Sequence, residues 1–177
     1  IHKSLAFFEK VSFDASIVKL ILIQSSPLIV QYAISIMSWE YFYILIEHHG
    51  ARALAISNTM RNIFGLFGIF SWAFASTANT LVSNIIGQGR QNEIVPLIHR
   101  ISKISFSISL FIFIILNSRP EWFLLFYGQG EEFIQEAVPV VRVVSVALLM
   151  MSFSTVWLNA VTGTGNTVVN LMIELVT

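Results

Sequence analysis

The stretch "ALAISNTMRNIFGLFGIFSWAFASTANTLVSNII" (residues 53–86) decides the fold of this chain. A helix needs about 20 mostly apolar residues to cross a bilayer, because the hydrocarbon core is roughly 30 Å thick and each helical residue rises about 1.5 Å. Residues 53–86 exceed this length, and Arg61 is the single charged residue among them. The stretch therefore predicts a membrane-spanning helix that tilts in the bilayer.

The composition extends this prediction to the whole chain. Of its 177 residues, 55% are hydrophobic and 11% are charged, whereas soluble domains carry about 25% charged residues. Ten basic and ten acidic residues balance, which argues against nucleic acid as a partner and leaves the lipid bilayer as the expected one. The sequence contains no cysteine, so disulfide bonds, thiolate metal sites and a cysteine nucleophile are excluded.

Further apolar stretches lie on both sides of residues 53–86. Three of them are candidate spans, at about residues 17–46, 101–116 and 138–160, and a fifth stretch begins near 168 and reaches 177. A membrane β-barrel would place a polar residue at every second position, and runs such as "SLFIFIIL" (109–116) lack that alternation. The predicted fold class is all-α, a multi-span transmembrane helical bundle with four spans and the start of a fifth. The first residue is not methionine and the fifth span is cut off, so we expect a fragment.

Glycine-bearing loops separate the predicted spans. "EHHGAR" (47–52), "GQGRQNE" (87–93) and "TGTGNT" (162–167) each follow an apolar run. The last two lack the lysine and hydroxyl spacing of a phosphate-binding loop and are typical of helix C-caps and tight turns. Adjacent histidines in an exposed turn are usually solvated, so no metal site is predicted at residues 48–49. The aromatic residues between 122 and 127 fit a short interfacial helix.

The distribution of lysine and arginine predicts the orientation, because positively charged loops stay in the cytoplasm. One side carries six basic residues and the other side carries Arg52 and Arg119; the six are Lys3, Lys10, Lys19, Arg90, Arg100 and Lys103. The N-terminal segment and the loop at 87–100 are therefore predicted to be cytoplasmic. Residues 1–16 read as a cytoplasmic linker or an interfacial helix.

Polar residues recur at helical spacing inside the apolar spans, which places them on one face of each helix. Small and hydroxyl-bearing residues at such positions allow membrane helices to approach one another and to form hydrogen bonds. For the amides, a second interpretation is equally well supported: they line a water-filled substrate cavity. So many amides seldom all find protein partners in lipid. The predicted cavity residues are Gln31, Ser35, Asn58, Asn62, Asn79 and Asn159.

Three ionisable residues lie within the spans: Glu40, Arg61 and Arg142. A helical hairpin centred on Gly50 brings Glu40 and Arg61 to nearly equal depth, where they can pair, and Arg142 competes for the same carboxylate. This charge cluster is predicted to be structural or gating; a substrate-contacting or titrating Glu40, and exposure at the outer interface, remain alternatives. Nearby aromatic residues at positions 39, 41 and 43 favour an aromatic belt at the headgroups over a drug-stacking site.

Four segments taken together resemble the multidrug and toxic compound extrusion (MATE) family of membrane transporters. They are "PLIVQ" (27–31), "EHHGARALAISNTMRNI" (47–63), "STANTLVSNIIGQGRQNE" (76–93) and "NAVTGTGNT" (159–167). The resemblance implies two six-helix bundles, of which residues 17–177 are part of the C-terminal one, with an N-terminal bundle as partner. Some members carry a carboxylate at the place of Ser35, and others carry one in the fourth span; neither has a match here. Asn58 falls where many members have an amide.

The resemblance implies a function in export. We expect a multi-pass protein of the cell inner membrane that exports small amphipathic or cationic compounds in exchange for Na⁺ or H⁺ by alternating access, with no other cofactor. Two alternatives remain, a lipid-linked oligosaccharide flippase of similar scaffold and a non-transporting membrane scaffold subunit. An enzyme is not expected, because no Ser/His/Asp arrangement can be assembled from the four histidines.

Overall fold

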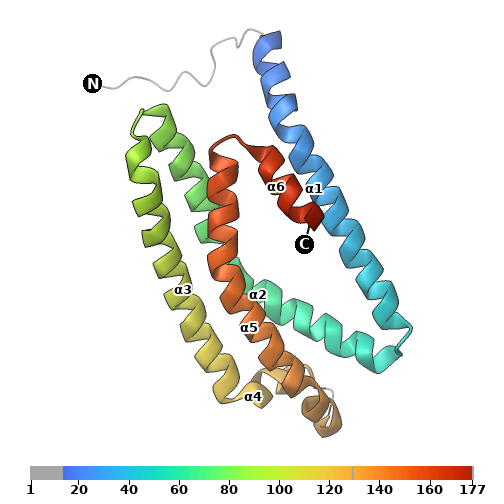
Figure 1. Ribbon diagram of the computed structural model, residues 1–177. Coiled ribbons are helices and arrows are strands. Elements are labelled where there is room, and N and C mark those ends of the chain that lie inside the picture. The colour runs from blue at the N-terminus through green and yellow to red at the C-terminus, as the bar shows by residue number, and fades with distance from the viewer. Residues whose placement is uncertain (1–13, 129, 177) are drawn as a thin grey trace, which may run out of the picture.

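The computed structural model describes residues 14–128 and 130–176, which form six α-helices, one 3₁₀-helix and no strand. The elements are α1 (Ala15–Glu47), α2 (Ala51–Gly87), η1 (Gln91–Glu93), α3 (Ile94–Ser118), α4 (Pro120–Leu125), α5 (Glu131–Gly163) and α6 (Thr167–Val176). Figure 1 shows an elongated arrangement in which the long helices run up and down and α6 lies alongside α1. The predicted all-α fold class is confirmed.

Four segments are long and apolar enough to cross a membrane: α1, α2, the stretch Gln91–Ser118 and α5. The helices continue beyond the apolar runs. Thus α3 begins at Ile94 rather than near 101, and α5 begins at Glu131 rather than near 138. Backbone hydrogen bonding does not stop at the membrane boundary, so charged end residues such as Arg100 extend a helix into the polar region. The expected short aromatic helix is present as α4.

The start of α1 lies at the edge of the described residues. Asp14 caps the helix by accepting a hydrogen bond from the Ser16 amide at 2.9 Å, and the Ser16 hydroxyl donates to the same oxygen at 2.5 Å. These hydrogen bonds lower the pKa of Asp14 from its usual value. Most of the predicted linker, residues 1–13, lies outside the described part of the chain.

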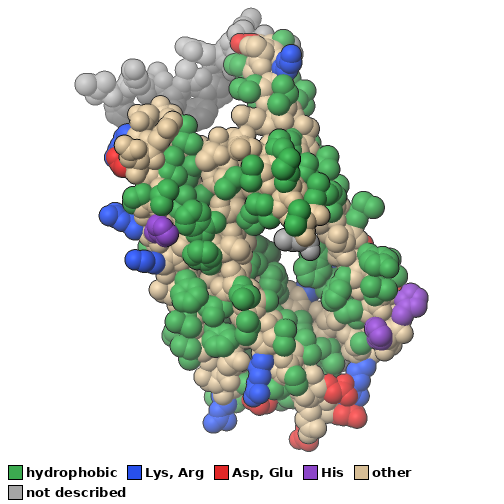
Figure 2. Space-filling view, viewed as in Figure 1, with side chains coloured by type: hydrophobic (Ala, Val, Ile, Leu, Met, Phe, Trp, Pro, Cys, Tyr) green, Lys and Arg blue, Asp and Glu red, His purple; other side chains and the backbone are tan. Residues whose placement is uncertain are grey.

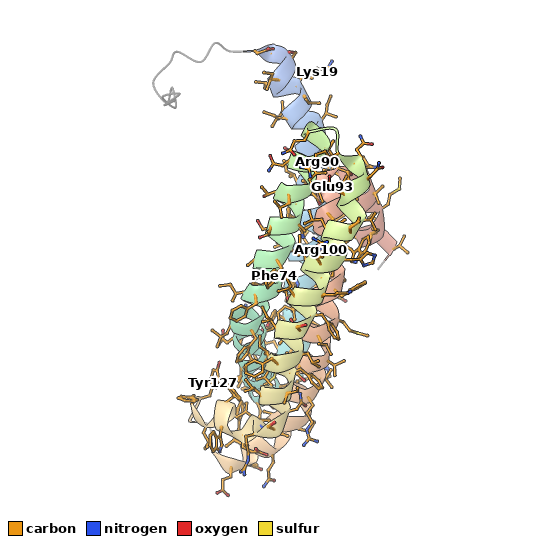
Figure 3. The ribbon with its side chains drawn as sticks, turned by 90° about the vertical axis from the view of Figure 1, so that its left-hand side faces the viewer. Lys19, Phe74, Arg90, Glu93, Arg100 and Tyr127 are labelled. Carbon is orange, nitrogen blue, oxygen red and sulfur yellow. The ribbon has the colours of Figure 1, made fainter. Side chains whose placement is uncertain are left out.

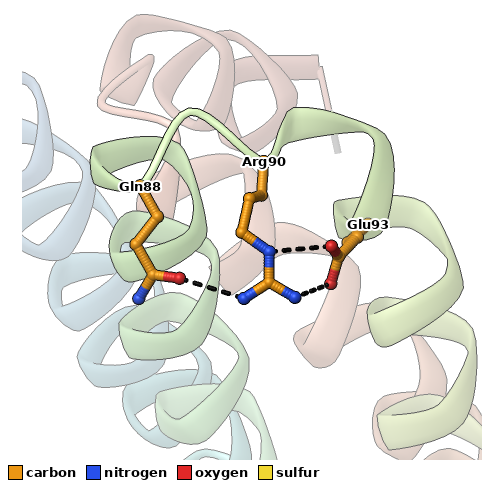
Figure 4. Close-up of polar contacts among 3 residues, drawn as sticks. All are labelled: Gln88, Arg90 and Glu93. Atoms are coloured by element: carbon orange, nitrogen blue, oxygen red, sulfur yellow. Dashed lines mark hydrogen bonds and ion pairs between the residues drawn. The ribbon is translucent and has the colours of Figure 1, made fainter.

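Glycine turns join the helices as the sequence indicates. Gly50 between α1 and α2 has a φ of 102°, a conformation that other residues rarely adopt. At the end of α2, the Arg90 amide donates to the Ile85 carbonyl and the Gly89 amide to the Ile86 carbonyl, which is a Schellman C-cap. Figure 4 shows the Arg90 guanidinium bonded to Gln88 and, through two nitrogens at 2.8 and 2.6 Å, to Glu93. "GQGRQNE" is therefore a cap and turn.

The core lies between α2, α3 and α5. Its fully buried apolar side chains include Val82, Leu116, Val141 and Val156. Buried serines hold the same helices together: Ser105 donates to the Ser152 carbonyl at 3.0 Å. Asn117 donates to the Ser145 hydroxyl at 2.8 Å, and the Ser71 and Ser109 hydroxyls lie 3.4 Å apart. Small hydroxyl-bearing faces thus serve helix packing here.

Helices α2 and α5 approach each other closely at Gly163. A Cβ atom on this residue would lie 2.6 Å from the Asn79 carbonyl oxygen and 3.1 Å from the Val82 Cβ. Beside it, the Ser83 hydroxyl donates to the Gly163 carbonyl at 2.9 Å. Only glycine fits this crossing.

Helix α1 does not take part in this buried core, because none of its described residues is buried. Pro27 lies inside it and removes one backbone donor. The Ser26 hydroxyl donates to the nearby Ile23 carbonyl at 3.3 Å, the carbonyl that the proline cannot reach. Contacts with α6 and with the first half of α2 hold α1 in place.

Acidic side chains lie toward the two ends of the molecule in Figure 2, whereas Lys and Arg side chains also lie beside a histidine near mid-height on the left. Figure 3 shows Lys19, Arg90 and Glu93 toward one end, Arg100 near the middle beside Phe74, and Tyr127 toward the other end. Arg52 lies on the Tyr127 side, where it pairs with Glu132 at 3.0 Å and Glu136 at 2.7 Å. Basic and acidic side chains therefore occur at both ends of the molecule.

We predict that Gly163→Ala destabilises the bundle by about 1–3 kcal/mol, because the added methyl group overpacks the α2–α5 crossing. Gly65→Ala is the matched control: no atom lies within 4 Å of its added Cβ, and both variants gain the same helix propensity. Detergent-induced unfolding followed by circular dichroism measures the difference. Equal stability of the two variants would contradict the predicted close approach.

Candidate functional site: an aromatic cavity between α1, α2 and α5

A cavity of about 390 Å³ lies between α1, α2 and α5. Five aromatic side chains and one basic side chain, that of Arg61, are among the residues that line it. The rings come from two helices: Trp39, Phe42 and Tyr43 from α1, and Phe64 and Trp72 from α2. Such a volume lies in the range of small-molecule sites, which are mostly apolar with few polar groups.

Helical spacing explains why these rings share one wall. Residues three and four positions apart lie on one helix face. Trp39 and Tyr43 stack with ring centroids 6.2 Å apart, and Trp39 meets Phe42 edge to face at 5.9 Å. On α2, Phe64 and Trp72 meet edge to face at 6.5 Å. The sequence favoured a headgroup belt for positions 39, 41 and 43, whereas the structure places Trp39 and Tyr43 on the cavity wall.

Arg61 reaches across from α2 to α1. Its guanidinium carbon lies 5.2 Å from the centre of the Tyr43 ring, within range of a cation–π interaction. Tyr43 is three residues after Glu40, so the hairpin does bring Arg61 to the depth of Glu40, as the spacing indicates. Arg61 nevertheless contacts the ring and not the carboxylate.

The expected charge cluster is not brought together. Within residues 14–128 and 130–176, the ion pairs join Arg52 to Glu132 and Glu136, and Arg90 to Glu93. Glu40, Arg61 and Arg142 form no ion pair among these described residues, and all three are exposed. A gating role for them stays a prediction.

A second hollow of about 300 Å³ adjoins the aromatic cavity and shares Trp39 and Phe42 with it. Ser35, Ser38 and Glu174 complete its lining. The Ser35 hydroxyl donates a hydrogen bond to the Glu174 carboxylate, although the two residues are 139 positions apart in the sequence. Sequence reasoning did not single out Glu174; an acidic residue in the apolar run after position 167 was the available signal.

The predicted cavity residues are only partly gathered at these hollows. Ser35 lines the second hollow, and Arg61 of the charge cluster lines the first. The five amides do not line either one; Asn62 is exposed, whereas Gln31, Asn58, Asn79 and Asn159 are half-buried. Asn159 donates to the Thr155 carbonyl of its own helix at 3.0 Å, and Asn79 lies at the α2–α5 crossing.

The comparisons with known proteins bear on this arrangement. A family model described as MatE matches residues 27–177. The chain belongs to the MatE family. No curated protein and no solved structure gives a significant match. The resemblance inferred from the sequence motifs is therefore confirmed, and the chain is a multi-pass membrane transporter of this family.

We predict that cysteines placed at Asn58 and Asn62 of this MatE protein react with a charged, membrane-impermeant thiol reagent, because the thiolate forms in water and not in hydrocarbon. The chain contains no native cysteine, so each variant has one thiol. Ala78→Cys is the control, since Ala78 is 0% exposed in the α2–α5 core, and it should react only after denaturation. Protection of positions 58 and 62 equal to that of position 78 would favour a scaffold without a translocation path.

Proposed function

We propose that this MatE protein is a secondary active exporter of amphipathic, cationic compounds, which it exchanges for Na⁺ or H⁺ by alternating access. The observation that carries the proposal is the aromatic cavity between α1, α2 and α5. Indole and phenol faces attract cations and stack on planar apolar groups. A compound with both properties is complementary to this cavity.

The position of the cavity supports a transport role. Trp39 and Tyr43 lie eleven and seven residues before the Gly50 turn, or roughly 10–16 Å along α1 at about 1.5 Å per residue. The cavity is therefore within the long helices and not on an end of the bundle. Sites enclosed by transmembrane helices are typical of transporters that expose them alternately to each side.

We further propose that the chain acts as the C-terminal bundle of a two-bundle transporter in the cell inner membrane. The exposed apolar side chains along α1 and α2, such as Met37 and Leu66, provide a surface for lipid or for a second bundle. By the positive-inside rule, the end that carries Lys19 and Arg90 would face the cytoplasm (Figure 3).

A lipid-linked oligosaccharide flippase is less well supported. Its anionic diphosphate substrate calls for several basic residues in the cavity. Among the described residues that line the two hollows, Arg61 is the only basic one.

We predict that Trp72→Ala lowers the efflux of a planar cationic dye such as ethidium, with KM raised about fivefold, because one aromatic face contributes about 1 kcal/mol to cation binding. The measurement is dye efflux from energised cells, at protein levels matched by immunoblotting. Trp122→Ala is the control, because Trp122 is 64% exposed on α4 and lies outside the cavity. Identical kinetics of the two variants would remove the aromatic cavity from the substrate path.

A further inference from the structure

A groove of about 320 Å³ lies on the surface where α3 ends and α4 begins, at the lower end of the molecule in Figure 1. The backbone leaves the helical conformation at Arg119, and Pro120 then starts α4. Ile114 and Ile115 line the groove from α3, and Trp122 and Phe126 line it from α4 and the residue after it. Arg119 lies between the two groups and also lines the groove.

The inner side of α4 is anchored in the core. Pro120 and Leu124, four residues apart on one helix face, are both buried. Phe123 meets Phe67 of α2 edge to face, with ring centroids 5.8 Å apart. These contacts fix α4 against the bundle, so the groove has a firm wall.

The outer side of α4 is apolar and exposed. Trp122, Leu125 and Phe126 are 64%, 60% and 90% exposed. Clustered apolar side chains on a protein surface mark a site of contact with a membrane or a partner. Trp residues at the end of a membrane span typically lie at the level of the lipid headgroups.

The groove crosses the end of a membrane span. Helix α3 belongs to the span Gln91–Ser118, so Arg119 is the first residue after it. Ile115 and Ile114 lie about 6–8 Å deeper, at about 1.5 Å per residue. The groove therefore runs from a basic group at the end of the span to apolar side chains inside it. A phospholipid has the same order, from its phosphate to its acyl chains.

The charge of Arg119 is not neutralised within the described chain. Its guanidinium carbon lies 6.0 Å from the centre of the Trp122 ring, which is at the limit of a cation–π interaction. The ion pairs among residues 14–128 and 130–176 do not include Arg119. Glu121 is only two residues away, but residues at this spacing do not face each other on a helix, and Glu121 does not line the groove.

We propose that this groove binds an anionic phospholipid of the phosphatidylglycerol type. Arg119 binds the phosphate, which a guanidinium contacts through two parallel hydrogen bonds, and an acyl chain lies on Ile114, Ile115 and Phe126. One positive charge balances one phosphate, whereas phosphatidylethanolamine adds an ammonium group that Arg119 repels. The groove shares no lining residue with the aromatic cavity, so the inference does not depend on which compound is exported.

Arg142 provides a matched control at a similar depth. Helices α3 and α5 are antiparallel, because Ser105 contacts Ser152 and Asn117 contacts Ser145. Arg119 is two residues after Asn117, and Arg142 is three residues before Ser145. Both are therefore displaced from this contact toward the same end of the molecule, by about 3 and 4.5 Å. Arg142 is exposed and does not line the groove.

The test is photocrosslinking of lipid to the full-length protein in phosphatidylcholine nanodiscs. The probe is phosphatidylglycerol or phosphatidylethanolamine with a diazirine near the glycerol end of one acyl chain, and mass spectrometry maps crosslinks to residues 114–126. We expect about fivefold more crosslinking with phosphatidylglycerol, since that is the effect of one basic residue on binding of an anionic lipid. Arg119→Gln should remove this preference, Arg119→Lys should keep most of it, and Arg142→Gln should leave it unchanged.

Each alternative has its own outcome in this experiment. Equal crosslinking of the two lipids, or an unchanged preference in Arg119→Gln that is folded by circular dichroism, overturns the phospholipid site. An equal loss of preference in Arg119→Gln and Arg142→Gln also overturns it, because the effect is then one of general charge at that end. No crosslinks at residues 114–126 with either lipid would mean that protein covers the groove, and this contradicts a lipid as its occupant.

Discussion

The close packing of α2 against α5 is the constraint on which the rest of the structure depends. Lipid does not donate or accept hydrogen bonds, so polar groups in the spans must be satisfied by neighbouring helices, and this requires the helices to approach closely. Gly163 allows that approach at Asn79, and the Ser83 hydroxyl of α2 donates to the Gly163 carbonyl beside it. A side chain at Gly163 would separate the helices and with them the walls of the cavity.

The same crossing divides the polar stripe of α2 into two parts. At the end near Gly163, the stripe serves packing, because Ser83 donates to α5 and Asn79 touches it. Toward Gly50, α2 approaches α1, and Gly65 and Trp72 border the aromatic cavity that lies beside the two helices. One periodic pattern in the sequence therefore has two physical roles, which depend on how far the neighbouring helix lies at each turn.

The fold could be predicted from the sequence because helix length, apolar runs and glycine turns are local properties. The aromatic wall was partly predictable, since the spacing of Trp39 and Tyr43 places them on one face of the helix. The spacing does not indicate which helix that face contacts. The partner of Ser35, Glu174, lies on α6, far along the chain, and their contact depends on a register that no local pattern encodes. Arg61 binds the Tyr43 ring rather than Glu40, because hairpin depth fixes only the level of two residues and not the direction of their side chains.

The absence of any buried residue in α1 has a mechanical consequence. The helices α2, α3 and α5 share a buried core. Helix α1 is joined to them by the short turn at Gly50 and is held by its contacts with α6. A displacement of α1 leaves the buried side chains of α2, α3 and α5 in place, although it breaks the contacts of α1 with α6. The molecule thus combines a packed three-helix core with one helix, α1, that can be displaced from it. Gln31 and Ser35 would move together with α1.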